Sequence, residues 1–211
     1  MTVLFSCQDY AVCVKPVGMD SEHALPEALT AALSGSFFPV HRLDLNVGGV
    51  MVYARNQQAA AAFARMIQQN QMTKEYLAIC HGTPPQCGVL EDLLWKDSKR
   101  NKVFVVSRVR SGVKKAQLQY QVITGSHDET TLIHIRLGTG RSHQIRVQFA
   151  SRGYPLLGDH KYGARDSLTQ PRLFACRLAF PWHGKLQTFE ALPEWAGIAS
   201  LPDPLPGPPD Q

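Results

Sequence analysis

Residues 137–149 read Leu-Gly-Thr-Gly-Arg-Ser-His-Gln-Ile-Arg-Val-Gln-Phe and couple a strand to a short helix. Two glycines in this stretch predict a tight turn after the strand. Beyond the turn, Ile145 and Phe149 recur at helical spacing and predict one apolar face. Residues 142 and 146, or 143 and 146, share another face. We therefore expect a polar cluster on a short helix that follows a strand of a sheet.

The rest of the chain favours strands over helices. Helical periodicity predicts one helix over 25–33 and a second over 57–70, capped by Asn56. Apolar or alternating runs predict strands over 3–5, 11–14, 49–54, 76–80, 103–109, 117–123, 131–137, 173–180 and 186–190. Several strands follow one another without a helix between them. This order predicts an α+β fold with a mixed, largely antiparallel sheet and flanking helices. We expect one domain over 1–200 and an extended, proline-rich tail over 201–211.

Charge is distributed unevenly along the 211 residues, whose formal net charge is +5. The first 35 residues carry one lysine against four acidic residues, whereas residues 96–115 carry eight basic residues opposed only by Asp97. Such segregation indicates a polyanionic partner. Two interpretations remain for residues 96–115: they bind a nucleic-acid backbone, or they form a solvated basic loop.

Several classes of protein are disfavoured by what the sequence lacks. No run approaches the roughly 18 apolar residues of a membrane span, and the N-terminus has no signal-peptide pattern. We therefore expect a soluble, cytoplasmic protein that contacts no membrane. The five cysteines form no C-x-x-C pair, which favours reduced thiols. No phosphate-binding or dinucleotide-binding glycine motif is present.

Three segments place polar residues where packing alone would not. The first is His41-Arg42-Leu43-Asp44, ahead of Gly48-Gly49 and a predicted strand; the second is Lys74-Glu75-Tyr76; the third is Gly140 to Arg146, with Gly158-Asp159 and Tyr162-Gly163 downstream. Plainer interpretations are a surface Arg–Asp pair and an ordinary strand tyrosine. A metal site on His41 with Asp44, or on Asp159 with His160, lacks a third ligand. A hydrolytic Ser142–His143–Asp44 set lacks a nucleophile elbow.

Taken in order, these motifs resemble those of the RluA-like family of RNA pseudouridine synthases. They are Lys15-Pro16-x-Gly18, His41-Arg42-Leu43-Asp44, Lys74-x-Tyr76, Gly140-Arg141-Ser142-His143-Gln144-Ile145-Arg146-Val147 and Gly158-Asp159-x-x-Tyr162-Gly163. The resemblance runs from about residue 3 to about residue 192. It implies a catalytic fold with a central basic cleft and isomerisation of uridines in structured rRNA or tRNA without a cofactor or metal. Many relatives carry an N-terminal S4 RNA-binding domain, for which we expect no room here.

The resemblance also assigns roles to individual residues. Asp44 is similar to the catalytic aspartate, which attacks the uridine at C1′ or C6 or assists glycosidic cleavage. Arg146 resembles the arginine that pairs with this aspartate, and Tyr76 the tyrosine beside the flipped base, where stacking or deprotonation of C5 are its two candidate roles. Contacts to a stem-loop of RNA are implied for His41, Arg42, Lys74, Arg141, His143 and Gln144. We expect a monomer that binds no DNA.

The chain departs from the family pattern after the aspartate. Where the family usually reads x-x-Thr-Ser-Gly, this chain reads Leu45-Asn46-Val47-Gly48-Gly49, so two hydroxyls are missing. Near the C-terminal strands, Phe174-Ala175 stands where the family usually has a His before an Ala. These changes leave an alternative open, namely an RNA-binding or RNA-folding factor that retains the fold but is catalytically impaired.

Overall fold

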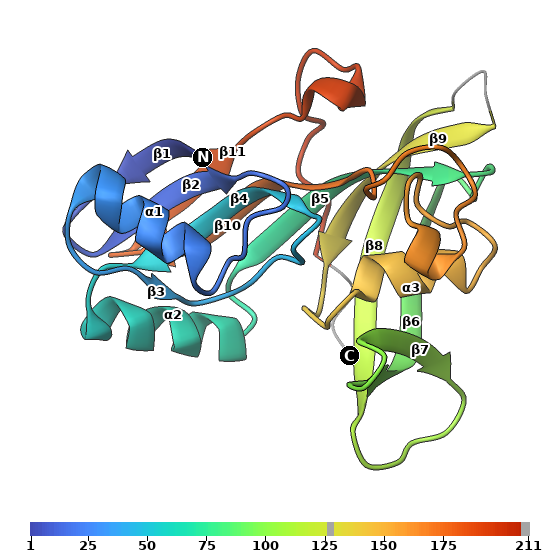
Figure 1. Cartoon of the computed structure of the whole chain (residues 1–211), viewed down its shortest axis with the longest axis horizontal. Helices are drawn as coiled ribbons and strands as arrows, with labels where there is room; N and C mark the ends of the chain where they lie inside the picture. The colour runs from blue at the N-terminus through green and yellow to red at the C-terminus, as the bar shows by residue number, and fades with distance from the viewer. Residues whose placement is uncertain (126–128, 208–211) are drawn as a thin grey trace. The chain divides into compact units, whose positions relative to one another are not determined.

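The computed structural model describes residues 1–125 and 129–207 (Figure 1). Its contacts divide the chain into two compact units. The first unit comprises residues 1–74 and 174–193, and the second comprises residues 75–173 and those from 194 onward. Each unit has its own strands, helices and apolar core.

Strands of mixed direction form the sheet of the first unit. β1 (Thr2–Ser6) pairs with β2 (Tyr10–Lys15), and β2 pairs with β4 (Gly48–Ala54). β4 runs parallel to β10 (Leu173–Trp182), which pairs with β11 (Lys185–Glu190). The two-residue β3 (Phe38–Pro39) also pairs with β4. All of these pairs except β4–β10 are antiparallel.

Helices cover both faces of β4, and all seven residues of that strand are buried. On one face, Phe63 of α2 (Gln57–Gln68) packs in a cluster with Val50 and Val52. Because side chains alternate along a strand, Tyr53 lies on the other face. Its hydroxyl donates to Ser21 O at 2.7 Å, just before α1 (Ala24–Leu33). Burial on both faces explains why β4 reads as a continuous apolar run.

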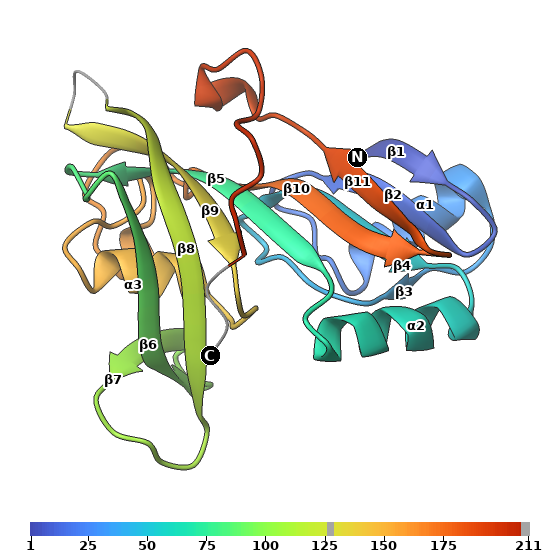
Figure 2. The same cartoon turned by 180° about the vertical axis from the view of Figure 1, so that it is seen from behind.

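Five antiparallel strands form the sheet of the second unit. In spatial order they are β5 (Thr73–His81), β9 (Thr130–Leu137), β8 (Val113–Gly125), β6 (Cys87–Asp97) and β7 (Lys102–Val106). α3 (Gln144–Ala150) lies over one face of β6 and β8 (Figure 2). Two short 3₁₀ helices, η1 (His160–Tyr162) and η2 (Glu194–Ala196), complete the unit.

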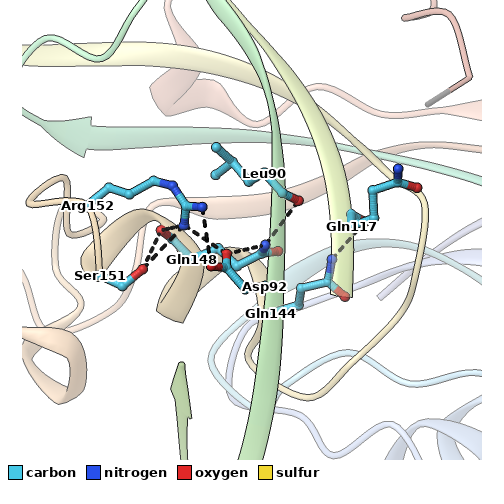
Figure 3. A network of polar contacts seen from close by, with 7 residues as sticks. All are labelled: Leu90, Asp92, Gln117, Gln144, Gln148, Ser151 and Arg152. Carbon is cyan, nitrogen blue, oxygen red and sulfur yellow. Dashed lines mark hydrogen bonds and ion pairs between the residues drawn. The ribbon is translucent and has the colours of Figure 1, made fainter. Parts of the chain in front are cut away.

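Polar contacts fasten α3 to β6 (Figure 3). Gln148 Nε2 donates to Leu90 O at 3.2 Å and to Asp92 Oδ2 at 2.7 Å. Arg152, just beyond the helix, donates from Nη1 to the same Asp92 oxygen at 2.8 Å. The Phe149 ring packs edge-on against Tyr120 of β8, with centroids 5.2 Å apart. These contacts fix the orientation of the helix that carries Arg146.

The segment 201–207 crosses the other face of the second unit's sheet (Figure 2). Leu205 is buried, and its N–H donates to Glu75 Oε1 at 3.1 Å. Its carbonyl accepts from Arg136 Nη1. Glu75 and Arg136 face each other across β5 and β9, so the segment crosses the face opposite the neighbouring Tyr76. Leu205 therefore ties the extended segment to the sheet.

The observed fold confirms the predicted class, a mixed and largely antiparallel sheet with flanking helices. The Asn56 cap is also confirmed, since its Oδ1 accepts from Ala59 N at 2.8 Å. The predicted strand over 103–109 ends at Val106, and β6 was not predicted. No described helix is long and apolar enough to cross a membrane. The basic cleft and the boundary at residue 200 stay predictions.

Candidate active site

The loop before β4 carries Asp44 and is held by a buried lysine. Lys15 has no exposed surface, and its Nζ donates to Pro16 O at 3.0 Å, Met19 O at 2.8 Å and Leu45 O at 3.2 Å. The Val47 N–H donates to Asp44 O at 3.0 Å and closes the turn. Before Asp44, the Leu43 carbonyl accepts from Ser21 Oγ at 3.1 Å, so the loop backbone is held on both sides of Asp44, while the Asp44 side chain is half-buried.

Burial disfavours the charged form of Lys15. Burial lowers the pKa of Lys15 to about 8, and the carboxylates of Asp20 and Asp44 oppose that decrease. Three carbonyl oxygens solvate the ammonium in place of water. The attraction between Lys15 and Asp44 means that the loop places a carboxylate near a fixed positive charge. The nearby carboxylates favour the ionised form of Lys15.

The loop glycines accommodate a close approach of strands. Gly49 has φ +131°, and a Cβ there would lie 2.4 Å from Ala175 O of the parallel strand β10. Only glycine fits this position, which is also the glycine of the family pattern. At Gly48, a Cβ would approach Lys15 O to 3.2 Å. The loop thus keeps the required glycine and is fixed by Lys15 although the family's two hydroxyls are missing.

His41 is a neutral side chain in the first unit. The Val52 N–H donates to its Nε2 at 3.1 Å, which requires a lone pair on that nitrogen. Burial, followed by the nearby charge of Lys74, holds the pKa of His41 well below its usual range. The imidazole therefore carries its proton on Nδ1. It can offer RNA a hydrogen-bond donor but no positive charge.

Two cations in the first unit differ in exposure. Arg42 is exposed and makes a 3.4 Å ion pair with Glu22, in which both side chains are about half exposed (54% and 51%). Such a pair contributes little to stability and leaves the guanidinium accessible to phosphate. Lys74, at the start of β5, is half-buried, and burial lowers its pKa to about 8. The predicted contacts of both residues with RNA stay predictions.

A buried ion pair in the second unit involves Arg146 of α3. Its Nε and Nη2 donate to Asp159 Oδ2 and Oδ1 at 2.7 and 2.8 Å. The two side chains are only 7% and 1% exposed. The bidentate geometry fixes the plane of the guanidinium. Asp159 is therefore an ion-pair partner of Arg146, and the predicted pairing of Arg146 with Asp44 stays a prediction.

Tyr162 gathers several groups around Arg146. The guanidinium carbon of Arg146 lies 5.1 Å from the centre of the Tyr162 ring. The Tyr162 hydroxyl is 2.8 Å from His143 Nδ1 and accepts from Val103 N at 2.9 Å. His143 has φ 50° and ψ 21°, a left-handed conformation that is uncommon outside glycine. A strained residue held by hydrogen bonds beside a buried arginine indicates a functional cluster.

The turn before α3 is shaped by Gln144. Its Oε1 accepts from Thr139 Oγ1 at 2.8 Å and from Arg141 N at 3.0 Å, and its Nε2 donates to Gln117 O at 2.9 Å. Both ends of the amide therefore bind protein. Exposed Arg141 donates from Nε to Lys115 O at 2.9 Å. The turn is rigid, and direct RNA contacts of Gln144, Arg141 and His143 stay predictions.

Tyr76 lies in β5 of the second unit, opposite Ile135 in the register with β9. Its side chain is 7% exposed.

Three residues of the site had no functional role assigned from the sequence, namely Lys15, Asp159 and Tyr162. All three belong to quoted motifs, and that membership was the available signal. Their partners lie on other elements, so spacing alone could not identify them.

A family model described as RNA pseudouridylate synthase matches residues 9–151, more than half of the chain. The chain belongs to the RNA pseudouridylate synthase family. This member is 32% identical to the dual-specificity RNA pseudouridine synthase RluA of Escherichia coli, over 72% of its own length and 71% of RluA. The likeness to RluA confirms the family that the motifs indicated.

Two further comparisons bear on length and fold. An RNA pseudouridine synthase of Chloroflexus aurantiacus, described as uncharacterized, is 34% identical over 76% of this synthase-family chain. The match covers 52% of that relative, so the chain spans about half of its length. The solved structure of human RNA pseudouridylate synthase domain containing 1 has a TM-score of 0.80 at 22% identity, covering 91% of this chain and 83% of that one. It shares the fold.

Proposed function

We propose that this protein is an RNA pseudouridine synthase that isomerises uridine in structured rRNA or tRNA. Membership of the RNA pseudouridylate synthase family carries the proposal. The family's aspartate motif is present at Asp44, in a loop whose backbone Lys15 binds at Leu45 O. A carboxylate on a backbone held in this way suits a nucleophilic or electrostatic role.

Asp44 acts on the uridine after its base has left the stack. The carboxylate attacks C1′ or C6, or assists departure of the base, and the N1–C1′ bond breaks. The uracil turns and C5 bonds to C1′. Any ester bond formed between Asp44 and C1′ or C6 breaks again and returns the carboxylate, C5 loses its proton and N1 ends protonated, so atoms and charge balance. We assign Tyr76 to stack against the base, because a phenol of pKa about 10 is a poor base at neutral pH. Arg146 supplies a positive charge whose orientation Asp159 fixes.

RNA binding is supported by the basic residues of the second unit. We use the name basic hairpin for β6, β7 and the turn that joins them. The hairpin carries exposed Lys96, Lys99 and Arg100 and half-buried Lys102. Nearby, the guanidinium carbon of Arg110 lies 4.8 Å from the centre of the Trp95 ring. Cations beside aromatic rings suit phosphate contacts and base stacking. These contacts offset the few kcal/mol needed to extrude a uridine.

Release of tritium from C5 tests the proposal. RNA labelled at uracil C5 is incubated with the wild-type protein, with Asp44→Asn and with Asp203→Asn, an exposed aspartate that serves as the matched control. We expect release by the wild type and the control and none by Asp44→Asn, with RNA binding retained in all three. RNA binding without release by any of them would favour the catalytically impaired RNA-binding factor.

Salt dependence tests the RNA-binding surface. Each neutralised phosphate releases counterions, so the RNA dissociation constant should rise steeply between about 50 and 200 mM salt. Replacing Lys99 and Arg100 by glutamine should reduce the slope of log Kd against log salt by about one to two. An unchanged slope in this double variant would remove the basic hairpin from the proposed binding surface.

A further inference from the structure

Tyr162 connects three separate parts of the second unit. It is the last residue of η1, and its hydroxyl accepts the N–H of Val103 on β7 at 2.9 Å. The same oxygen lies 2.8 Å from Nδ1 of His143, the residue that precedes α3. Its ring lies against Arg146 at 5.1 Å. A single side chain therefore contacts the basic hairpin, the start of α3 and the buried arginine.

The neighbouring contacts strengthen the connection between η1 and the basic hairpin. Lys161 Nζ donates to Asn101 O in the turn of the hairpin at 2.7 Å. Lys102 Nζ lies 5.4 Å from the centre of the Tyr162 ring. Val103 is 2% exposed, so its N–H has no solvent to replace the tyrosine oxygen. Displacement of the hairpin must therefore displace Tyr162 or break these contacts.

Two residues that contact the Arg146 guanidinium come from the same short segment. Asp159 holds one edge of the guanidinium, and Tyr162, three residues later, holds a cation–π contact with it. Tyr162 N donates to Asp159 O at 3.0 Å, which keeps the two residues in one turn. A shift of this turn therefore changes the contacts of Arg146 with Asp159 and Tyr162 together. The turn is in contact with the hairpin through Tyr162.

We propose that Tyr162 is a positioning residue that couples RNA seated on the basic hairpin to the orientation of Arg146 and His143. The inference rests on the proposed function, because it takes RNA as the ligand of the hairpin. It adds to that function a physical link between RNA binding on the basic hairpin and catalysis at the site of Arg146. The hydroxyl carries the link to the hairpin, and the ring carries the link to Arg146.

Removal of the hydroxyl alone tests the coupling. Tyr162→Phe keeps the ring and loses the contacts to Val103 and His143. Tyr154→Phe is the matched control, since Tyr154 is half-buried in the same unit and its hydroxyl makes no hydrogen bond in the part of the chain that the structure describes. Single-turnover tritium release and the RNA dissociation constant are measured for both. We expect Tyr162→Phe to lower the rate at least tenfold with Kd changed less than threefold, and the control to change neither.

Hydrogen exchange separates failure of the coupling from failure of the proposed reaction. In the wild type, RNA should slow amide exchange over residues 159–164, and Tyr162→Phe should abolish that slowing while exchange at Val103 becomes faster. This readout needs no turnover, so it decides the coupling even if the wild type releases no tritium. RNA-dependent slowing that persists unchanged in Tyr162→Phe, or a wild-type rate in that variant, would overturn the proposal.

Discussion

Asp159→Asn is expected to destabilise the protein by about 3–5 kcal/mol. The substitution keeps the shape of the side chain but removes the charge opposite Arg146, which is 7% exposed. Only one of the two carboxylate oxygens then remains as an acceptor, and the new amide NH₂ faces an N–H donor of the guanidinium. A buried cation that loses its partner costs several kcal/mol, more than the pair contributes when intact.

The expected loss can be compared with a more exposed pair. Arg177 donates from Nε to Glu190 Oε1 at 2.5 Å in the first unit, but Glu190 is 47% exposed. The Arg177 side chain is itself only 6% exposed, but water can reach the carboxylate side of the pair. Glu190→Gln should therefore cost less than Asp159→Asn, about 1–2 kcal/mol. Both variants are measured by urea unfolding followed by circular dichroism.

A double-mutant cycle completes this prediction. Adding Arg146→Gln to Asp159→Asn should restore part of the stability, because the unpaired cation is then gone. If Asp159→Asn costs less than about 1 kcal/mol, or no more than Glu190→Gln, the Arg146 guanidinium is not desolvated. The claim that Asp159 fixes its orientation would then be wrong.

Three further substitutions test other parts of the structure. Burial lowers the pKa of Lys15 from 10.5 to about 8, so the unfolded chain binds more protons between these values and stability should rise with pH there, by up to about 3 kcal/mol. Lys15→Met should lack this rise in urea titrations at pH 7.5 and 10. Burial alone would raise the pKa of Asp166, but hydrogen bonds from three backbone amides and from His81 lower it to about 2. Asp166 should thus contribute about 1–2 kcal/mol to the free energy of unfolding above pH 4, and this contribution is lost as the pH falls through 2. In Asp166→Asn the free energy of unfolding should therefore depend less on pH in that range. Gly49→Ala should lower Tm by about 10 °C or more in calorimetry, because its Cβ would overlap Ala175 O.

Local patterns were sufficient to predict much of the fold. The apolar run at 49–54 and the Asn56 cap each depend on neighbouring residues alone, and both were predicted correctly. Strand β6 was not predicted, because buried and exposed residues do not simply alternate along it and because Glu91 and Asp92 interrupt its apolar residues. Glu91 accepts from Gln117 at 2.8 Å and Asp92 from Gln148 at 2.7 Å, so tertiary contacts make these acidic residues acceptable in a strand.

Candidate site residues were predictable by type but not by partner. The motifs indicated Asp44, Arg146 and Tyr76, whereas the Arg146–Asp159 pair joins a helix to a loop 13 residues later. Nothing in the sequence specifies that the loop returns to the helix. The return depends on Gly158, which has φ +79° and where a Cβ would overlap Gln170 O, so other residues are excluded. Long-range geometry of this kind follows from tertiary packing, which periodicity does not encode.

The attachment of Leu205 has a practical consequence for shortened or tagged versions of the protein. Its N–H and carbonyl are bound by Glu75 and Arg136, which lie on two adjacent strands. Ending the chain before residue 205 would leave these groups without their backbone partners and uncover an apolar spot on the sheet. Proline content alone would mark 201–207 as dispensable, yet purification tags and protease sites belong after this segment rather than in place of it.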